Sequence, residues 1–410
     1  KRNSIVILIL TVFFINVNAQ NIDTSYKTLE SITVVSRNLK ITEKASPYSI
    51  TKLDQHQIAS SAFRTTPEAL MGSNGVFIQK TNHGGGSPFI RGLTGNQTLI
   101  LVDGIRLNNS TFRYGPNQYL NTIDMFTIDK IEVAKGIGAI EYGSDAMGGV
   151  INLSTKENEY SSRPIVHAST LGKFISSNME QTSRSEISFS NAQLAIQGGL
   201  SFKNYGNLKG GGNVGIQNPT GYNENNIDLK VKLKITKQDE VIIATQNTIQ
   251  HHVPIYHKIA LENYRINEVE KQARSLNYVK YKHIDNNKWF AEFLVTASTQ
   301  RTIEQRSLQR NNSTIYRNEA DTVHTIGMTS EIISKPTKYW TFNTGFDYYQ
   351  DNIYSSAKEL NQQTNTTVFK RGLYPNAAKY NNSSVFNLHH FQLGRLFIET
   401  GLRYNFLKIN

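Results

Sequence analysis

The sequence contains no cysteine among its 410 residues, which excludes disulfide scaffolds, zinc–thiolate sites and thiol catalysis. It also lacks an apolar run near the roughly 20 residues that a membrane-spanning helix needs. Charged residues amount to only 19%, below the roughly 25% of typical soluble domains, while 20 tyrosines and 19 phenylalanines are present. This composition favours strands with one polar face and one apolar, aromatic face.

Basic residues outnumber acidic ones by 44 to 32, which gives a formal net charge of +12. Because the lysines and arginines are spread along the chain without a dense basic tract, we do not expect a nucleic-acid partner. The sequence contains no G-x-S-x-G, H-E-x-x-H or P-loop motif, and the glycines at 136 and 138 lack the third glycine of a dinucleotide fingerprint. We therefore expect neither an enzyme nor a bound cofactor.

Residues 1–19 have the layout of a secretory signal peptide. A basic start precedes an apolar stretch at 5–15, and small residues lie before a cleavage point ahead of Gln20. The apolar stretch is about half the length required to span a bilayer, which argues against a membrane anchor. We expect the chain to be exported to the cell envelope or surface.

The exported part divides near residues 156–160 into two regions of different pattern. Residues 38–155 are dense in glycine and mix signals for helices and strands. Thr66 as N-cap and Pro67 open a short helix, and Asp103 with Gly104 supplies the turn of a hairpin. This region is predicted to be a small mixed α/β domain.

Residues 160–410 alternate between apolar and polar side chains. Odd positions of 227–235 are apolar and even positions are Asp or Lys, and 340–348 and 395–406 repeat this period of two. These segments run for about 9 to 15 residues, whereas strands of soluble proteins usually stop at about 5–6 and membrane-barrel strands need about 9–11. Strand length therefore favours a transmembrane β-barrel over a soluble β-sandwich.

Eleven such strands are predicted, and the connections between them alternate between short turns and longer loops. Tight turns at one end and extended loops at the other are typical of outer-membrane barrels. The long loops are predicted at 204–224, 252–272, 304–320 and 354–382. The strands are predicted at 164–172, 178–190, 193–203, 225–236, 239–251, 273–284, 288–303, 321–334, 338–353, 383–391 and 395–409.

Four motifs of the first region resemble those of the plug domain of TonB-dependent outer-membrane receptors, in the same order and at similar spacing. The resemblance implies a plug inside a barrel of about 22 strands, the plugged-lumen class, of which eleven strands are half. The chain also ends without the terminal aromatic residue of the family's closing strand, so we expect an N-terminal fragment. The motifs are FIRG at 89–92, LILVDGIRL at 99–107, IEVAKG at 131–136 and YGSDAMGGVINL at 142–153. The implied parts are a signal peptide (1–19), an extension (20–37), a plug (38–155) and a truncated half-barrel (160–410).

The resemblance further implies a segment through which the periplasmic protein TonB supplies energy. An extended, β-prone segment can add as an edge strand to such a partner. Alternatively, a β-branched run of this kind near an N-terminus has no function. The segment that resembles a TonB box consists of Glu30, Ser31, Ile32, Thr33, Val34, Val35 and Ser36.

The resemblance also implies a latch between the plug and the barrel at Arg91, Glu132 and Lys135. Arg91 and Lys135 would face carboxylates of the barrel wall and hold the plug in place. The family commonly has arginine where Lys135 stands, and lysine cannot form the bidentate contact of arginine. Retention of the plug at this second position is therefore expected to be weaker.

Candidate ligand contacts lie in two predicted apical loops of the plug, 80–87 and 108–116. Glycines after His83 would allow a bulky ligand to approach closely, and the His83 imidazole is a candidate axial ligand of haem iron. The alternative is an ordinary loop histidine. The second loop contributes Phe112, Arg113 and Tyr114, and both loops resemble those of haem and haemoglobin receptors.

A third candidate is a histidine-rich segment at the start of the predicted loop 252–272. Its side chains would contact a metal chelate or the edge of haem, although polar-loop histidines need no such role, and Pro254 interrupts regular strand spacing. No resident metal is expected. The candidates are His251, His252, Tyr256 and His257.

We therefore expect a monomeric barrel, embedded in outer-membrane lipid, that takes up a bulky and scarce ligand with energy relayed by TonB. The leading ligand is an iron chelate, either a ferric siderophore or haem, which would be cargo and not a cofactor. The alternative is a surface receptor for binding, adhesion or signalling without net transport. A signalling receptor usually carries an extra domain before the box, and only residues 20–29 lie there.

Overall fold

The computed structural model describes residues 32–33, 41–42, 49–80, 82–83, 85–114, 119–136 and 139–410. The predicted signal peptide and most of the predicted TonB box lie outside these residues. Of the box, only Ile32–Thr33 (β1) is described, and it pairs antiparallel with Ile41–Thr42 (β2). No helix in the described ranges is both long and apolar enough to cross a membrane.

The plug is built around a five-stranded sheet with the order β3-β8-β9-β6-β7. Strands β6 and β9 are parallel and the other neighbours are antiparallel. Every residue of β6 is buried, which explains its continuous apolar sequence TLILV. The strands are Ser49–Leu53 (β3), Thr98–Val102 (β6), Ile105–Arg106 (β7), Ile128–Lys135 (β8) and Gly149–Thr155 (β9).

Short elements surround this sheet. Asp54 and Gln57 form a reciprocal capping box at the start of α2. Helix α3 begins one residue earlier than expected, because its N-cap is Thr65, while the Thr66 hydroxyl donates to the carbonyl of Ile123. The elements are Gln55–Ser61 (α2), Thr66–Ala69 (α3), Ala139–Tyr142 (α4), the hairpin Val76–Lys80 (β4) and Gly86–Ile90 (β5), and the 3-10 turns Gly95–Gln97 (η3), Tyr119–Thr122 (η4) and Met125–Thr127 (η5).

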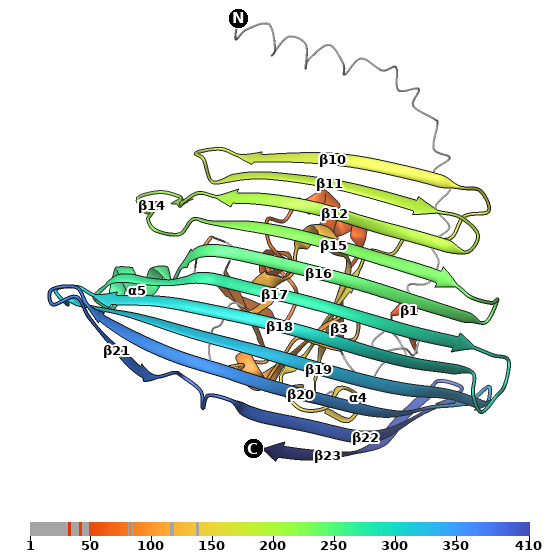
Figure 1. Cartoon of the computed structure of the whole chain (residues 1–410). Helices are drawn as coiled ribbons and strands as arrows, with labels where there is room; N and C mark the ends of the chain where they lie inside the picture. Colours follow the sequence, from red (N-terminus) through yellow and green to blue (C-terminus); the bar gives the residue numbers. More distant parts are fainter. Residues whose placement is uncertain are drawn as a thin grey trace, which may run out of the picture.

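The remainder of the chain forms one curved antiparallel sheet in which eleven strands pair in sequence order. The prediction of eleven long strands is confirmed. The sheet curves around the plug, and its edges are β10 and β23 (Figure 1). The strands are Ile165–Ile175 (β10), Glu180–Ser190 (β11), Leu194–Tyr205 (β12), Tyr222–Lys234 (β15), Asp239–Pro254 (β16), Tyr264–Ile284 (β17), Glu292–Arg310 (β18), Ile315–Thr337 (β19), Trp340–Asn361 (β20), Ala378–Leu393 (β22) and Leu396–Ile409 (β23).

Tight turns lie at one end of the sheet and longer connections at the other, but the longer connections span fewer residues than predicted. Helix α5 (Tyr256–Leu261) and the small strands Leu208–Gly210 (β13), Gly215–Gln217 (β14) and Thr366–Arg371 (β21) occupy the left-hand end in Figure 1. The prediction of a loop at 304–320 is wrong, because β18 and β19 continue to a turn at 311–314. Side chains on both faces of these strand ends are mostly polar, so the sequence shows no alternation there. Backbone hydrogen bonds between β18 and β19 nevertheless continue to the turn.

The apolar core of the plug continues into the barrel wall. Buried residues of β6, β8 and β9 form one cluster with Ile242 and Ala244 of β16 and with Leu276 and Tyr278 of β17. The plug is therefore packed against the wall through apolar contacts as well as polar ones. This shared core places the edge of the plug sheet directly on the central strands of the wall.

Candidate functional site

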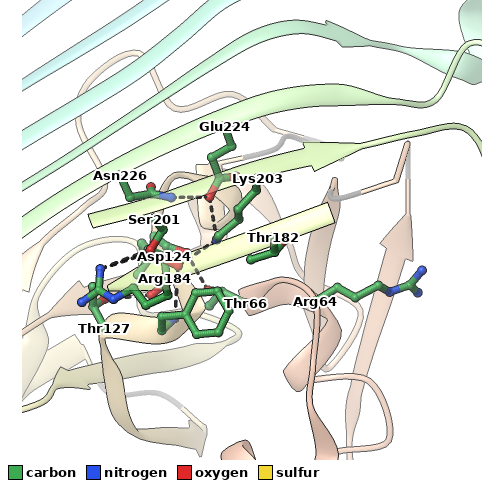
Figure 2. Close-up of polar contacts among 12 residues, drawn as sticks. Arg64, Thr66, Asp124, Thr127, Thr182, Arg184, Ser201, Lys203, Glu224 and Asn226 are labelled. Atoms are coloured by element: carbon green, nitrogen blue, oxygen red, sulfur yellow. Dashed lines mark hydrogen bonds and ion pairs between the residues drawn. The ribbon is translucent and has the colours of Figure 1, made fainter. Parts of the chain in front are cut away.

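A buried ionic cluster joins the plug to the wall (Figure 2). Asp124 lies at the start of η5, where its Oδ1 also accepts from the amide of Phe126 at 3.1 Å. The Nζ of Lys203 lies 2.7 Å from Asp124 Oδ1, and the hydroxyl of Ser201 donates to Oδ2 at 2.6 Å. Arg184 Nη1 is 3.7 Å from the same Oδ2. We call the set Asp124, Arg184, Glu186, Lys203, Glu224 and Asp228 the Asp124 cluster.

Barrel carboxylates complete the Asp124 cluster. Lys203 Nζ is also 2.7 Å from Glu224, and Arg184 Nη1 is 2.6 Å from Asp228. The Arg184 side chain lies across Gly199, where any added Cβ would clash with the guanidinium. Two cations thus hold one plug carboxylate among three barrel carboxylates.

The electrostatics keep Asp124 ionised. Burial by itself acts to raise the pKa of this carboxyl, but Lys203 and Arg184 outweigh it, and the pKa lies below the usual value. Asp124 is only 3% exposed. Removing one partner of such a buried pair leaves an uncompensated charge, so the contact resists separation of the plug from the wall.

A second polar contact involves Asp103 in the turn between β6 and β7. Asp103 and Gly104 both adopt positive φ, 51° and 82°, as the predicted Asp-Gly hairpin requires. Asp103 Oδ2 accepts from the Tyr278 hydroxyl at 2.9 Å and lies 3.5 Å from Lys230 Nζ. Lys280 Nζ donates to the Asp103 carbonyl at 3.0 Å. The hairpin turn therefore also anchors the plug to β15 and β17.

The predicted apical loop 108–116 reaches the wall near the long-loop end. The amide of Ser110 donates to Asp351 at 2.7 Å, and Asn109 Nδ2 donates to the Thr302 hydroxyl at 3.1 Å. Arg113 Nη2 is 2.7 Å from Glu304. These contacts tie one plug loop to β18 and β20.

The ring of Phe112 is buried and stacks on Tyr119 with centroids 3.7 Å apart, whereas Tyr114 is 73% exposed. The three candidates of the second loop therefore differ in their surroundings: Phe112 packs inside the loop, Arg113 joins the loop to the wall, and Tyr114 is mostly exposed.

A cavity of about 340 Å³ lies beside this loop. Arg106 and Asp145 form an ion pair of 2.6 Å at its wall, and burial raises the pKa of the Asp145 carboxyl although Arg106 opposes this. Phenols, amides and charged groups converge there and can donate to and accept from a polar ligand. The lining includes Arg106, Asp145, Tyr349, Asp351, Tyr374 and Tyr380.

His83 is buried and held by neighbours at the long-loop end. Its Nδ1 lies 2.9 Å from the carbonyl of Gly206, its Nε2 is 3.4 Å from Arg64 Nη1, and its ring contacts Tyr205 at 4.8 Å. Burial lowers the pKa of His83 to about 4, so the imidazole is neutral. Iron ligation by His83 stays a prediction, and in this arrangement it requires the loop to move.

The histidine-rich segment is spread over two elements. His251 and His252 end β16, and His252 Nδ1 lies 3.1 Å from Glu268. Tyr256 and His257 begin α5. Among the described residues no group of three or more His, Asp or Glu side chains is arranged to hold a metal ion. A role for these four residues in ligand contact stays a prediction.

The three predicted latch residues have contacts within the plug. Arg91 Nη2 donates to the carbonyl of Lys135 at 3.2 Å, and Lys135 Nζ donates to Thr51 and to the carbonyl of Asn74. Glu132 is 3.0 Å from Lys130. Their role as a latch stays a prediction. The wall is contacted instead by Asp124, which sequence analysis did not single out, and by Asp103, which it predicted only as a turn residue.

Comparison with known proteins identifies the first region. Residues 42–150 match the family model described as TonB-dependent Receptor Plug Domain. The chain is 30% identical over 154 residues to the vitamin B12 transporter BtuB of Vibrio vulnificus and 34% identical over 142 residues to an iron-regulated outer membrane virulence protein of Vibrio cholerae. These matches cover 37% and 32% of this chain, and 23% and 21% of the relatives.

A solved structure extends the similarity to the barrel. The copper transporter OprC superposes with a TM-score of 0.70 at 13% identity, covering 87% of this chain and 55% of that one. The chain therefore spans about half the length of this structure and has its fold. These proteins are named as transporters and an outer-membrane protein, not as enzymes.

Proposed function

We propose that this chain belongs to the TonB-dependent outer-membrane receptors, whose plug-domain model matches residues 42–150, and that it forms the plug and part of the barrel of an importer driven through TonB. The observation that carries this proposal is the plug seated on the wall through the buried Asp124 cluster and the Asp103 turn. A plug held by polar contacts and by a shared apolar core, without a covalent link to the wall strands it packs on, would occlude the barrel at rest and could be displaced by force. Residues 30–36 are the proposed point of attachment for TonB.

We propose an iron chelate as the cargo, in the first place a ferric siderophore. The cavity beside loop 108–116 supports this choice, because its tyrosines, Arg106 and Asp351 provide both hydrogen-bond donors and hydrogen-bond acceptors for a polar chelate. Haem is the second candidate. It would need His83 to leave the contact with Gly206 before the imidazole could reach iron.

Ligand occupancy would be sensed through the same loop. A chelate bound beside Ser110 would compete for Asp351 and disturb the link to β20. This movement would reach η5 through Tyr119, whose hydroxyl accepts from the Arg113 amide at 3.2 Å and which begins η4, the turn just before Asp124. The alternative, a surface receptor without transport, would use the cavity but would not need a displaceable plug.

Deletion of residues 30–36 tests this function. Binding of labelled ferric siderophore to cells that produce the receptor is expected to persist, because the described residues that line the cavity belong to other parts of the chain. Energised uptake is expected to stop. A matched deletion of residues 20–26 in the same extension is the control and should leave uptake intact. Uptake at the normal rate without residues 30–36 would contradict the proposal.

A further inference from the structure

We propose that the short-turn end of the sheet carries a binding surface for anionic phospholipid headgroups. This inference rests on the proposed position of the chain in the outer membrane. It concerns Lys237, Lys288, Lys338 and Arg395, which we call the turn cations. Each lies in a different turn between neighbouring strands: β15–β16, β17–β18, β19–β20 and β22–β23. These turns lie at the right-hand end of the sheet in Figure 1.

All four turn cations are exposed, and within the described part of the chain none of them forms an ion pair with a carboxylate, although Lys338 Nζ lies over the ring of Tyr339, 4.8 Å from its centroid. Lys282 and Lys335 of the same region differ, because both pair with Glu292 at 3.7 and 3.2 Å. Glu292 is therefore taken up by other lysines. Three further carboxylates in or beside these turns bond to other groups: Asp239 to His283, Glu240 to Tyr160 and Asp285 to Gln238. The four turn cations outnumber these three carboxylates, so the rim keeps a net positive charge.

An aromatic belt lies directly behind this rim and marks the depth of the membrane interface. Trp289 contacts Trp340 and Phe342 at 6.4 and 6.2 Å, and Trp340 stacks on Phe391 at 5.9 Å. Residues of β20 that alternate with Trp340 and Phe342 are buried towards the plug, so these rings face outward. Trp289 is 56% exposed. Both tryptophans of the chain belong to this belt.

Depth and charge together specify the partner. Tryptophan and tyrosine settle at the level of lipid headgroups, and cations just beyond them face the phosphates. The outward face beyond the belt is apolar and exposed, as at Ile243, Val279 and Phe346, which is the surface that acyl chains cover. A phospholipid thus meets an apolar wall, an aromatic belt and a free cation in that order. Because the cations are spaced one per hairpin, the surface would hold a row of anionic lipids, such as phosphatidylglycerol, in the leaflet that faces the periplasm.

Lipid counting on the purified receptor tests this surface. The receptor is equilibrated in mixed micelles with equal phosphatidylglycerol and phosphatidylethanolamine, and bound lipids are counted by native mass spectrometry at low and high salt. The normal protein is expected to retain phosphatidylglycerol preferentially, and salt should weaken the preference. K288Q/K338Q should weaken the preference for phosphatidylglycerol about fivefold at each of the two altered turns, so that the number of phosphatidylglycerol molecules retained at low salt falls to roughly half.

The control variant K209Q/R371Q removes two exposed cations at the opposite, long-loop end and should keep the normal ratio. An unchanged ratio in K288Q/K338Q, or an equal loss in the control, would overturn the inference. So would a variant that keeps its lipid ratio but loses binding to polyglutamate, since the cations would then serve an acidic protein. Failure here leaves the proposed uptake standing if deletion of residues 30–36 still stops it.

Discussion

The contact of Asp124 with the barrel gives the sharpest prediction about how firmly the plug is held. Asp124→Asn keeps the size of the side chain and an acceptor for the amide of Phe126, which lies 3.1 Å away. It removes the charge that faces Lys203 at 2.7 Å and Arg184 at 3.7 Å. The change also replaces Oδ2, which accepts from the Ser201 hydroxyl at 2.6 Å, by an amide NH2, so this hydroxyl must turn to accept instead.

The magnitude follows from the partners that remain. Breaking a buried ion pair by removing one partner typically costs about 3–5 kcal/mol. Here Lys203 keeps Glu224 at 2.7 Å, and Arg184 keeps Asp228 at 2.6 Å. In addition, Glu186 of the Asp124 cluster pairs both with Arg184 at 3.2 Å and with Lys156 at 3.0 Å. The four carboxylates thus face three cations, and the loss of one negative charge leaves this network neutral. We expect the seated plug to lose about 2 kcal/mol, which is roughly a 30-fold change in its equilibrium.

Chemical unfolding of the plug in the intact receptor, followed by hydrogen exchange of the β6 and β9 amides, measures this cost. A double-mutant cycle of Asp124→Asn with Lys203→Met isolates the pair, and its coupling energy should exceed about 1 kcal/mol. Asp129→Asn is the matched control: this plug carboxylate is only partly buried, and within the described residues it forms no ion pair. Its effect should stay within about 0.5 kcal/mol.

Additive effects of the two substitutions would refute this account of plug retention. Equal effects of Asp124→Asn and Asp129→Asn would do so as well, because any loss of plug charge would then suffice. The pH dependence offers a further check. Since the folded pKa of Asp124 lies below its usual value, the stability it contributes is present above the unfolded pKa, near 3.9, and is lost only as pH falls through the folded pKa.

Three further substitutions test neighbouring features. Burial lowers the pKa of His83 to about 4, so the folded plug disfavours protonation of this imidazole. The free energy of unfolding of the plug is therefore unaffected by His83 above pH 6.5 and falls by about 3 kcal/mol as the pH drops to 4. His83→Gln should remove this part of the pH dependence of plug melting. Glu304→Gln removes the ion pair to the apical loop and should speed hydrogen exchange of the amides at 108–114 about fivefold. Gly199→Ala should cost about 1–3 kcal/mol of plug stability because the added methyl group clashes with a guanidinium, whereas Gly172→Ala, which meets open space, should leave the melting temperature unchanged.

The strands of the barrel were predictable because their pattern is local. Alternation in β15 assigns Ile227 and Leu229 to the outside and Lys230 to the inside, and the structure agrees. The Asp-Gly hairpin was predictable for the same reason, since Asp103 and Gly104 must both adopt positive φ. The residues at which strands stop near the long loops could not be predicted, because backbone pairing continues into segments whose two faces are both polar.

The plug–barrel contacts could not be predicted from the sequence, because they join segments that are far apart along the chain. Ser201 and Asp124 are 77 positions apart and share no motif, and Asp103 had a sufficient local explanation as a turn residue. One usable signal was present: Lys230 and Lys232 lie on the inner face, and buried lysines require carboxylate partners. Those partners had to come from the plug or from neighbouring strands, as Asp103 and Glu157 do.

The most direct test of the proposed transport is to lock the plug to the wall. Asn109 Nδ2 and the Thr302 hydroxyl are 3.1 Å apart, so N109C/T302C places two thiols on facing side chains in a chain that has no other cysteine. A short, reducible bifunctional thiol reagent can bridge them, because a cysteine Sγ lies one bond nearer the backbone than Asn109 Nδ2 does. The cross-linked receptor should still bind ferric siderophore but import none, and reduction of the linkage should restore uptake in the same sample. Normal uptake by the fully cross-linked receptor would contradict displacement of this part of the plug during transport.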